Sequence, residues 1–600
     1  MGLASRVARE ARYVRGLAGG LSKVKSIRGN SPQLVCDDWE AAVDRHGSNT
    51  AVSFEGRTLT YDAYDALANR FANWALATGL KRGDAVAIFL PNRLEYVAAW
   101  MGLGKAGVVG ALINNNLAGQ PLVHCIEIAG AQHVIADAET APVLQAARDR
   151  LKRPLTVWVL DGGPEGGRSS GDRDLDRALQ NAAATRPDRA LRQGMTASDL
   201  ALYIYTSGTT GLPKAARITH VRAQTYMRGF WGSTRSKPDD RVYIVLPLYH
   251  ATGGLCGVGA ALLSGGTAVI RKRFSAARFW EDIAAEGCTM FVYIGELCRY
   301  LVNQPERPEE RAHKLRLAFG NGLRPDVWEQ FERRFGIPQV LEFYGATEGN
   351  VSIINFDGKL GSIGRVAPYV RHRFNVRLVR LDKETGDPVR GPDGFCVACK
   401  PGEIGEAVGR IGSEPRSTYS GYADKSATEK KVLRDAFRKG DAWFRTGDLM
   451  RQDSEGYFYF VDRMGDTFRW KGENVSTSEV CEALCRIEGV KEAVVYGVPA
   501  PGADGKAGMA ALATGPEFDL AVLAARIDAE LPSYARPVFL RLQAEIGTTG
   551  TFKYTKADLV ADGFDPAKVA EPLLFRDPQD GYVPLDPELY ARICAGALRL

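Results

Sequence analysis

Apolar and polar positions along the first 350 residues follow two periods, that of a buried strand and that of an amphipathic helix. Continuous apolar runs predict strands at 84–90, 132–136 and 156–160, whereas 64–76 and 93–107 carry apolar residues at helical spacing. Strands that alternate with helices in this way indicate βαβ units, whose strands are parallel. The pattern therefore predicts an α/β fold with mostly parallel sheets.

Three of the predicted strands end in polar, glycine-bearing loops. The strand 202–204 leads to Tyr205, a second strand leads to Gly320, and the strand 339–343 leads to Tyr344. In an open α/β sheet, ligands bind outside the carboxyl ends of the strands. If the three ends lie side by side, one nucleotide-sized site contacts all of them.

The loop from Tyr205 to Lys214 has the composition of a phosphate-binding loop. Small residues let backbone N–H groups approach an anion, hydroxyls add donors, and the lysine adds a positive charge. It is not a Walker A loop, because Ala215 follows the lysine. A flexible linker is the alternative, but a linker rarely ends in Pro-Lys beside an apolar strand. The candidate phosphate-binding residues are Tyr205, Thr206, Ser207, Gly208, Thr209, Thr210, Gly211 and Lys214.

Composition and charge exclude several classes of protein. The chain is 45% hydrophobic and 25% charged, as in soluble globular proteins, and its 600 residues predict two or more domains. A net charge of +6 argues against a protein that coats nucleic acid. No apolar run approaches the roughly 20 residues that span a bilayer, and no secretory signal is visible. We therefore expect a cytoplasmic protein.

Cysteine spacing argues against a zinc site. The one CxxC motif, Cys396–Cys399, has no second pair at zinc-finger spacing. Reduced, buried thiols are the better interpretation.

The first 30 residues form a basic arm. Against one acid, Glu10, residues 1–28 carry Arg6, Arg9, Arg12, Arg15, Lys23, Lys25 and Arg28, and their apolar residues recur at helical spacing. A basic amphipathic helix of this kind can make peripheral contact with an anionic membrane, here the inner face of the cell membrane. A solvated or partly disordered arm is the alternative, because Gly19-Gly20 weakens a helix.

Several motifs, in their order and spacing, resemble the adenylate-forming (AMP-binding) superfamily. They are Tyr205–Lys214, Tyr344–Asn350, Trp443–Asp448 and Asp462–Arg463. Within the superfamily, the chain is similar to the fatty acid transport protein and very-long-chain acyl-CoA synthetase family, on residues 318–324, 462–474 and 549–553. The resemblance extends from about Trp39 to the C-terminus.

The resemblance implies a two-step ligase. A fatty carboxylate attacks the α-phosphate of ATP and releases pyrophosphate, and the thiol of CoA then attacks the acyl-adenylate and expels AMP. Attack by an anion on a polyanion needs positioning and charge neutralisation more than covalent help from the protein. The implied enzyme is an ATP- and Mg²⁺-dependent long- or very-long-chain acyl-CoA synthetase, which could also contribute to fatty acid uptake.

The resemblance also implies roles for the nucleotide-binding residues. One wall of the adenine pocket would be Gly320, Asn321 and Gly322, and the other would be Tyr344, followed by Gly345, Ala346 and Thr347. Thr347 would bond the α-phosphate, and Glu348 would bind Mg²⁺, which prefers oxygen ligands. Asp448 would accept hydrogen bonds from both ribose hydroxyls, and Arg463 is implied as a further nucleotide-binding residue.

Further catalytic residues are implied in the C-terminal part and at His250. Lys553 would bridge the carboxylate and α-phosphate oxygens during adenylation, and the loop Lys471, Gly472 and Glu473 would serve thioester formation. His250 would lie near the acyl carboxylate, although a core histidine satisfied by the backbone is the alternative. Two residues depart from the superfamily pattern, Gly465 in the hinge and Phe552 before the catalytic lysine.

Near Asp462 the pattern changes to a smaller α/β unit. We predict a basic arm over 1–30, a large multi-layered ATP- and acyl-binding domain over 31–462, a hinge at 463–465, and a small mobile α+β domain over 466–600. By the resemblance, the C-terminal domain rotates between the two half-reactions.

Three other functions stay open at this point. A fatty acyl-AMP ligase that loads a carrier protein would share the adenylation residues, and a CoA ligase for another carboxylate (carnitine, a bile acid or an aryl acid) would differ only in its acyl pocket. A fatty-acid uptake or scaffold protein would not need the magnesium ligand Glu348. The sequence leaves chain-length preference and oligomeric state open.

Overall fold

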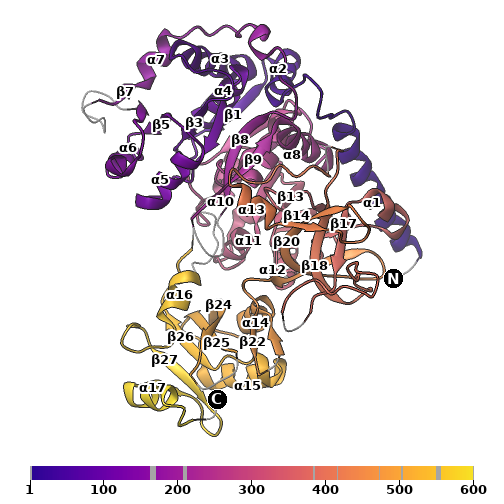
Figure 1. The fold of residues 1–600 in the computed structure, drawn as a ribbon, viewed down its shortest axis with the longest axis vertical. Coiled ribbons are helices and arrows are strands. Elements are labelled where there is room, and N and C mark those ends of the chain that lie inside the picture. Colours follow the sequence, from indigo (N-terminus) through magenta and orange to yellow (C-terminus); the bar gives the residue numbers. More distant parts are fainter. Residues whose placement is uncertain are drawn as a thin grey trace. The chain divides into compact units, whose positions relative to one another are not determined.

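The computed structural model describes residues 3–161, 171–206, 212–382, 385–414, 417–471, 473–501, 505–548 and 556–598. The chain forms two compact units (Figure 1). Unit 1 contains residues 1–376 and 409–444, and unit 2 contains residues 377–408 and 445–600. The α/β class is confirmed, and the hinge at 463–465 stays a prediction, because it concerns motion.

An eight-stranded sheet in unit 1 carries two of the three strand ends that the sequence singled out. Its six inner strands pair in parallel, and an antiparallel strand closes each edge. Parallel strands covered on both faces are apolar throughout, which is why they appear as continuous hydrophobic runs. The order is β15 (Ser352–Asn355), β14 (Val340–Gly345), β13 (Leu317–Asn321), β12 (Met290–Ile294), β10 (Arg241–Ile244), β11 (Thr267–Ile270), β1 (Thr50–Phe54) and β2 (Arg57–Thr60).

A seven-stranded sheet in unit 1 carries the third strand end. All of its pairs are parallel except β8 with β9, which form an antiparallel hairpin. The order is β7 (Arg173–Asp174), β6 (Thr156–Leu160), β5 (His133–Asp137), β3 (Ala85–Ile88), β4 (Val109–Leu112), β8 (Leu200–Thr206) and β9 (Lys214–Thr219).

Helices cover both sheets of unit 1. Figure 1 shows α3 and α4 packed side by side near α2. The helix α8 lies against the eight-stranded sheet, where the ring of Phe230 is 4.6 Å from that of Phe343. The helices of unit 1 after the arm are α2 (Val35–His46), α3 (Tyr61–Ala77), α4 (Glu95–Lys105), α5 (Gly119–Ile128), α6 (Ala141–Gln145), α7 (Leu175–Asn181), α8 (His220–Ser233), α9 (Val258–Leu262), α10 (Phe279–Ala285), α11 (Gly295–Val302), α12 (Pro325–Phe335) and α13 (Lys425–Glu429).

The basic arm is a helix, α1 (Leu3–Val24), which packs along α8. Tyr13 is buried on this helix. The pair Gly19-Gly20 does not break it; instead, a Cβ on Gly19 would lie 2.6 Å from the carbonyl oxygen of Gly232 on α8. The glycines permit close helix packing, so residues 3–24 form an ordered helix rather than the partly disordered arm of the alternative. Within the described residues, we find no helix with the length and apolar character to cross a membrane.

Unit 2 contains a five-stranded sheet with its own hydrophobic core. The sheet order is β24 (Val490–Pro499), β25 (Lys506–Thr514), β26 (Phe539–Gln543), β27 (Leu573–Asp577) and β28 (Gly581–Pro584). Its helices are α14 (Thr477–Cys485), α15 (Leu520–Glu530), α16 (Lys556–Asp562) and α17 (Pro587–Cys594), and a hairpin joins β22 (Phe468–Trp470) to β23 (Glu473–Val475).

A further group of strands lies between residues 364 and 463. They are β16 (Gly364–Arg365), β17 (Val376–Val379), β18 (Ile404–Arg410), β19 (Val432–Arg434), β20 (Ala442–Gln452) and β21 (Tyr457–Arg463). Within unit 1, β19 pairs with the start of β20. Within unit 2, the rest of β20 pairs with β21, directly before the predicted hinge.

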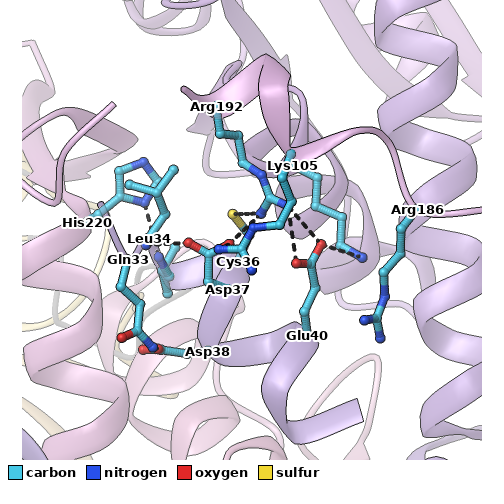
Figure 2. Close-up of polar contacts among 12 residues, drawn as sticks. Gln33, Leu34, Cys36, Asp37, Asp38, Glu40, Lys105, Arg186, Arg192 and His220 are labelled. Carbon is cyan, nitrogen blue, oxygen red and sulfur yellow. Dashed lines mark hydrogen bonds and ion pairs between the residues drawn. The ribbon is translucent and has the colours of Figure 1, made fainter. Parts of the chain in front are cut away.

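A network of buried charges ties α2 to α3, α4 and the segment before β8 (Figure 2). Arg192 binds Asp37 at 2.8 Å and Glu40 at 3.1 Å. Lys105 on α4 is fully buried and binds Asp65 on α3 at 2.5 Å. Buried charges persist only when they are paired, so this network fixes how the three helices pack.

Candidate active site

The predicted phosphate loop is the connection of a β-hairpin. Thr206, the last residue of β8, pairs with Lys214, the first residue of β9. Tyr205 is buried, and its hydroxyl donates to the carbonyl of Cys125 at 2.6 Å, so its side chain anchors the strand rather than lining the loop. Ser207, Gly208, Thr209, Thr210 and Gly211 lie outside the described residues.

Tyr422 contacts Glu348 and the two residues that flank the hairpin loop, Thr206 and Lys214. Its hydroxyl donates to Glu348 Oε1 at 2.6 Å, and Lys214 Nζ lies 5.7 Å from the centre of its ring. Burial and the charge of Glu348 raise the pKa of Tyr422, against the effect of a side-chain hydrogen bond with Thr206. One tyrosine therefore brings together three of the predicted site residues.

The segment around Tyr422 extends the sheet beside β9. The amide of Arg217 donates to Gly421 O at 3.0 Å, and the amide of Ala423 donates to Ala215 O at 2.9 Å. Sequence reasoning missed Tyr422, because a tyrosine between glycine and alanine carries no signal of its own. Its role comes from the pairing of its segment with β9.

The turn that carries Thr347 and Glu348 is held from α8. Tyr226 donates to Ala346 O at 2.9 Å, and the guanidinium of Arg222 donates to Gly349 O. A Cβ on Gly349 would lie 2.4 Å from the ring of Phe444. The turn therefore has little freedom, which is what a site that positions a phosphate needs.

The loop after β13 forms a narrow wall beside Tyr344 at the end of β14. A Cβ on Gly320 would lie 2.1 Å from Tyr293 O, and Gly322 has a φ of +78°, so both positions favour glycine. Asn321 Oδ1 is buried and accepts no hydrogen bond from the described residues. An unsatisfied buried acceptor is costly, and the exocyclic amine of adenine would satisfy it.

Glu342 lies beneath this wall and was also missed by sequence reasoning. It is 1% exposed, and it accepts hydrogen bonds from the hydroxyl of Tyr293 at 2.6 Å and from the amide of Leu323 at 3.1 Å. Burial raises the pKa of Glu342 to about 8. The residue positions the loop 320–323, and a glutamate inside an apolar strand was the only sequence signal.

Replacing Glu342 by glutamine should flatten the pH dependence of stability. In the folded protein, the carboxyl keeps its proton up to about pH 8, whereas its ordinary value is 4.5, so its stabilising contribution is full below pH 4.5 and is lost as pH rises to about 8. Each pH unit in that window costs about 1.4 kcal/mol. Thermal unfolding of the wild type and Glu342→Gln across the window measures the slope. Equal slopes would contradict the assignment.

His250 follows β10, in a loop fixed by Asn92. The side chain of Asn92 donates to Leu246 O at 3.0 Å and accepts from the amide of Leu248 at 2.8 Å. The amide of His250 donates to Pro247 O, and its half-buried ring lies 5.0 Å from that of Tyr249. These contacts fix the histidine backbone, and its role beside the acyl carboxylate stays a prediction.

Asp448 and Arg463 lie together in unit 2. They are direct partners in the β20–β21 pair, and Arg463 Nε is 3.6 Å from Asp448 Oδ1. The amide of Asp448 donates to the hydroxyl of Thr446 at 3.1 Å. A carboxylate backed by a guanidinium suits the two hydroxyls of a ribose.

The predicted thioester loop is the turn of the β22–β23 hairpin. Lys471 is exposed and has a φ of +50°, and Glu473 pairs with Trp470 across the turn. Gly472 and Lys553 lie outside the described residues. Lys471 and Glu473 are presented to solvent, where a thiol substrate could reach them.

Glu348 fits a magnesium ion held mainly by substrate. In the described part of the chain, no group of three or more His, Cys, Asp or Glu side chains could hold a metal. A single carboxylate is nevertheless enough, because Mg²⁺ keeps several waters and binds one or two carboxylates together with substrate phosphates.

Comparison with known proteins decides the family. Residues 39–410 match the family described as AMP-binding enzyme, and residues 479–553 match the AMP-binding enzyme C-terminal domain. The chain belongs to the AMP-binding, adenylate-forming family. The predicted resemblance is therefore confirmed, and the chain is an ATP-dependent acyl-CoA synthetase, whose substrates are ATP, a carboxylic acid and CoA.

Curated relatives place the chain within the family. Long-chain fatty acid transport protein 1 of Mus musculus is 46% identical over 549 residues, which cover 91% of this chain and 84% of that protein. Long-chain fatty acid transport protein 3 of Homo sapiens is 44% identical, and the matched residues cover 87% of this chain and 76% of that protein. The chain belongs to this branch of the family.

Solved structures share the fold. The anthranilate CoA ligase AuaEII in complex with anthranoyl-AMP superposes with a TM-score of 0.75 at 20% identity, covering 90% of this chain and 98% of that one. A Mycobacterium tuberculosis fatty acyl CoA synthetase gives a TM-score of 0.62 at 25% identity, covering 88% and 98%. These two confirm the AMP-binding enzyme architecture.

Proposed function

We propose that the protein is a long- or very-long-chain fatty acid–CoA ligase that acts through an acyl-adenylate. The observation that carries the proposal is the convergence of Lys214, Thr206 and Glu348 on Tyr422, beside the adenine wall of the same unit. The identity with long-chain fatty acid transport proteins supports a fatty acid as the carboxylate.

The residues of unit 1 support the first half-reaction. Lys214 would neutralise the β- and γ-phosphates, and Thr347 would bond the α-phosphate at the point of attack. Glu348, oriented by Tyr422, would hold Mg²⁺, which supplies charge neutralisation when bound. Positioned charge of this kind is the main source of rate in phosphoryl chemistry.

The residues of unit 2 would serve the nucleotide sugar and both half-reactions. Asp448 and Arg463 would bind the ribose, and Lys553 would bridge the carboxylate and the α-phosphate. The turn of Lys471, Gly472 and Glu473 would serve attack by CoA. Rotation about residues 463–465 would let Lys553 act in adenylation and the turn of residues 471–473 act in thioester formation. The lone glycine Gly465 would permit large backbone changes there.

We also propose peripheral contact with the cytoplasmic face of a membrane through α1. The helix buries Tyr13 but exposes Val7 and Val14, at 61% and 50%, beside the exposed Arg12 and Arg15. Exposed valines among cations suit an anionic surface. Because α1 carries a buried residue, substitution of exposed residues tests this contact better than deletion does.

A pyrophosphate-release assay with a panel of acids tests the substrate. Oleate and very-long-chain acids should give the highest kcat/KM, and carnitine, bile and aryl acids the lowest. Higher rates with an aryl or bile acid would overturn the fatty acid assignment. Adding CoA tests the other alternative, a fatty acyl-AMP ligase that loads a carrier protein. Such an enzyme would accumulate acyl-adenylate without forming a thioester.

A further inference from the structure

A basic surface pocket lies at the junction of α1, α2 and α8. Its volume is about 610 Å³, and four cationic side chains line it, Lys23, Arg45, Arg235 and Lys237, together with His46. Trp231 and small or hydroxyl-bearing residues complete the lining, and none of its lining residues is Asp or Glu. The predicted nucleotide residues are not among them.

In the ranges that the structure describes, none of the four cations forms an ion pair with a carboxylate. Two nearby acids have other partners, since Asp44 binds Arg186 at 2.7 Å and Asp240 binds Arg316 at 2.6 Å. Lys23 Nζ lies 3.4 Å from the centre of the Trp231 ring, and burial together with the charge of Arg45 lowers the pKa of Lys23.

Arg235 occupies a position where glycine is favoured. It follows the C-terminus of α8 with a φ of +52°, and the amide of the next residue, Ser236, donates to Trp231 O at 3.2 Å. This is the Schellman motif, whose left-handed residue is usually glycine, because a side chain is unfavourable in that backbone conformation. Arg235 therefore adopts an unfavourable backbone conformation, but its side chain adds a positive charge to the pocket lining.

Helix dipoles are the alternative explanation for the cations. The helices α1, α2 and α8 all end at this pocket, and each C-terminus carries roughly −0.5 of an elementary charge. Together they offset roughly one and a half of the four positive charges. The remaining positive excess, in a pocket with no carboxylate in its lining, favours an anionic ligand.

We propose that this pocket binds a phosphate group, carried by an anionic lipid headgroup or by a soluble phosphate ester. Lysine and arginine bind phosphate through charge-assisted hydrogen bonds, and several together make a specific site. The proposal does not depend on the identity of the acyl substrate, because the pocket is separate from the predicted adenylation residues.

Two probes distinguish the possible sources of the phosphate. Binding of the full chain is measured to phosphatidylcholine vesicles with and without phosphatidic acid, and to glycerol 3-phosphate by calorimetry. The pocket variant Arg45→Gln/Lys237→Gln is compared with Lys152→Gln/Arg153→Gln, which removes the same charge from exposed positions that neither line the pocket nor belong to α1. We expect the pocket variant to bind about tenfold more weakly, and the control to lose clearly less.

The outcomes distinguish a lipid headgroup, a soluble phosphate ester and the alternative that the cations only offset the helix dipoles. Loss confined to phosphatidic acid vesicles identifies a lipid headgroup, and loss of glycerol 3-phosphate binding identifies a soluble ester. Equal loss in the two variants, or no binding of either probe by the wild type, overturns the proposal. Acyl-CoA formation and thermal unfolding verify that each variant folds, and Lys237→Glu alone serves if the double variant does not.

Discussion

Lys553→Ala should slow acyl-adenylate formation by about 10²–10³-fold, the loss typical when one donor to a developing charge is removed. By resemblance, this lysine bridges the carboxylate and the α-phosphate only during the first half-reaction. Thioester formation from supplied acyl-adenylate and CoA should therefore be largely unchanged. Single-turnover pyrophosphate release and thioester formation, measured separately, give the two rates.

The reciprocal control is Lys471→Ala in the exposed turn of the β22–β23 hairpin. It should slow thioester formation and spare adenylation. Both variants losing both half-reactions equally would contradict a C-terminal domain that presents different residues in each step.

Lys105→Met should destabilise unit 1 by about 3–5 kcal/mol, the usual loss when one member of a buried ion pair is removed. Lys105 Nζ binds Asp65 at 2.5 Å, Asn69 at 2.6 Å and Glu40 at 3.4 Å, and its side chain is fully buried. Methionine fills a similar volume but leaves the carboxylates with fewer partners. Denaturant unfolding followed by tryptophan fluorescence measures the change, since Trp39 Nε1 donates to Asp65 at 2.7 Å.

The loss should also depend on pH. Burial alone would raise the pKa of Asp65, but Lys105 and Arg186 bring it below the ordinary value. In the wild type, this stabilisation is therefore present above the ordinary pKa and is lost as pH falls through the lower one. Without Lys105 the pKa should rise, so the variant recovers part of its stability in mild acid, where Asp65 is protonated.

A matched surface variant is Lys152→Met. Lys152 lies 3.8 Å from Glu127 with 85% of its side chain exposed, and such pairs contribute about 0–1 kcal/mol. A comparable loss in the two variants would contradict a special role for burial.

Periodicity in the sequence predicted most strands of unit 1. Their apolar runs are long because both sheet faces are covered, so Val86 and Ile88 on β3 are as buried as Val134 and Ile135 on β5. The arm was harder to predict, because Gly19-Gly20 has opposite meanings in an isolated helix and in a helix packed against another. Only the contact partner distinguishes the two.

The contacts beside the predicted hinge could not be predicted from the sequence either. Sequence placed Asp462 in a motif before the hinge. In the structure its buried carboxylate accepts from the amide of Thr477 at 2.6 Å and from the hydroxyl of Thr467 at 3.3 Å. It thus holds the N-terminus of α14 beside the end of β21. Partners 15 residues apart are invisible to a local pattern.

The sequence by itself determined the family, the reaction class and the identity of the candidate residues, because Tyr205–Lys214, Tyr344–Asn350 and Trp443–Asp448 are local motifs with fixed spacing. The tertiary structure decided how Glu348 is held, that the buried acceptor in the predicted adenine wall is Asn321 Oδ1, and that the arm packs on α8. Tyr422, Glu342 and the basic pocket depend on contacts between distant segments. Those contacts arise only when the sheets and helices have packed.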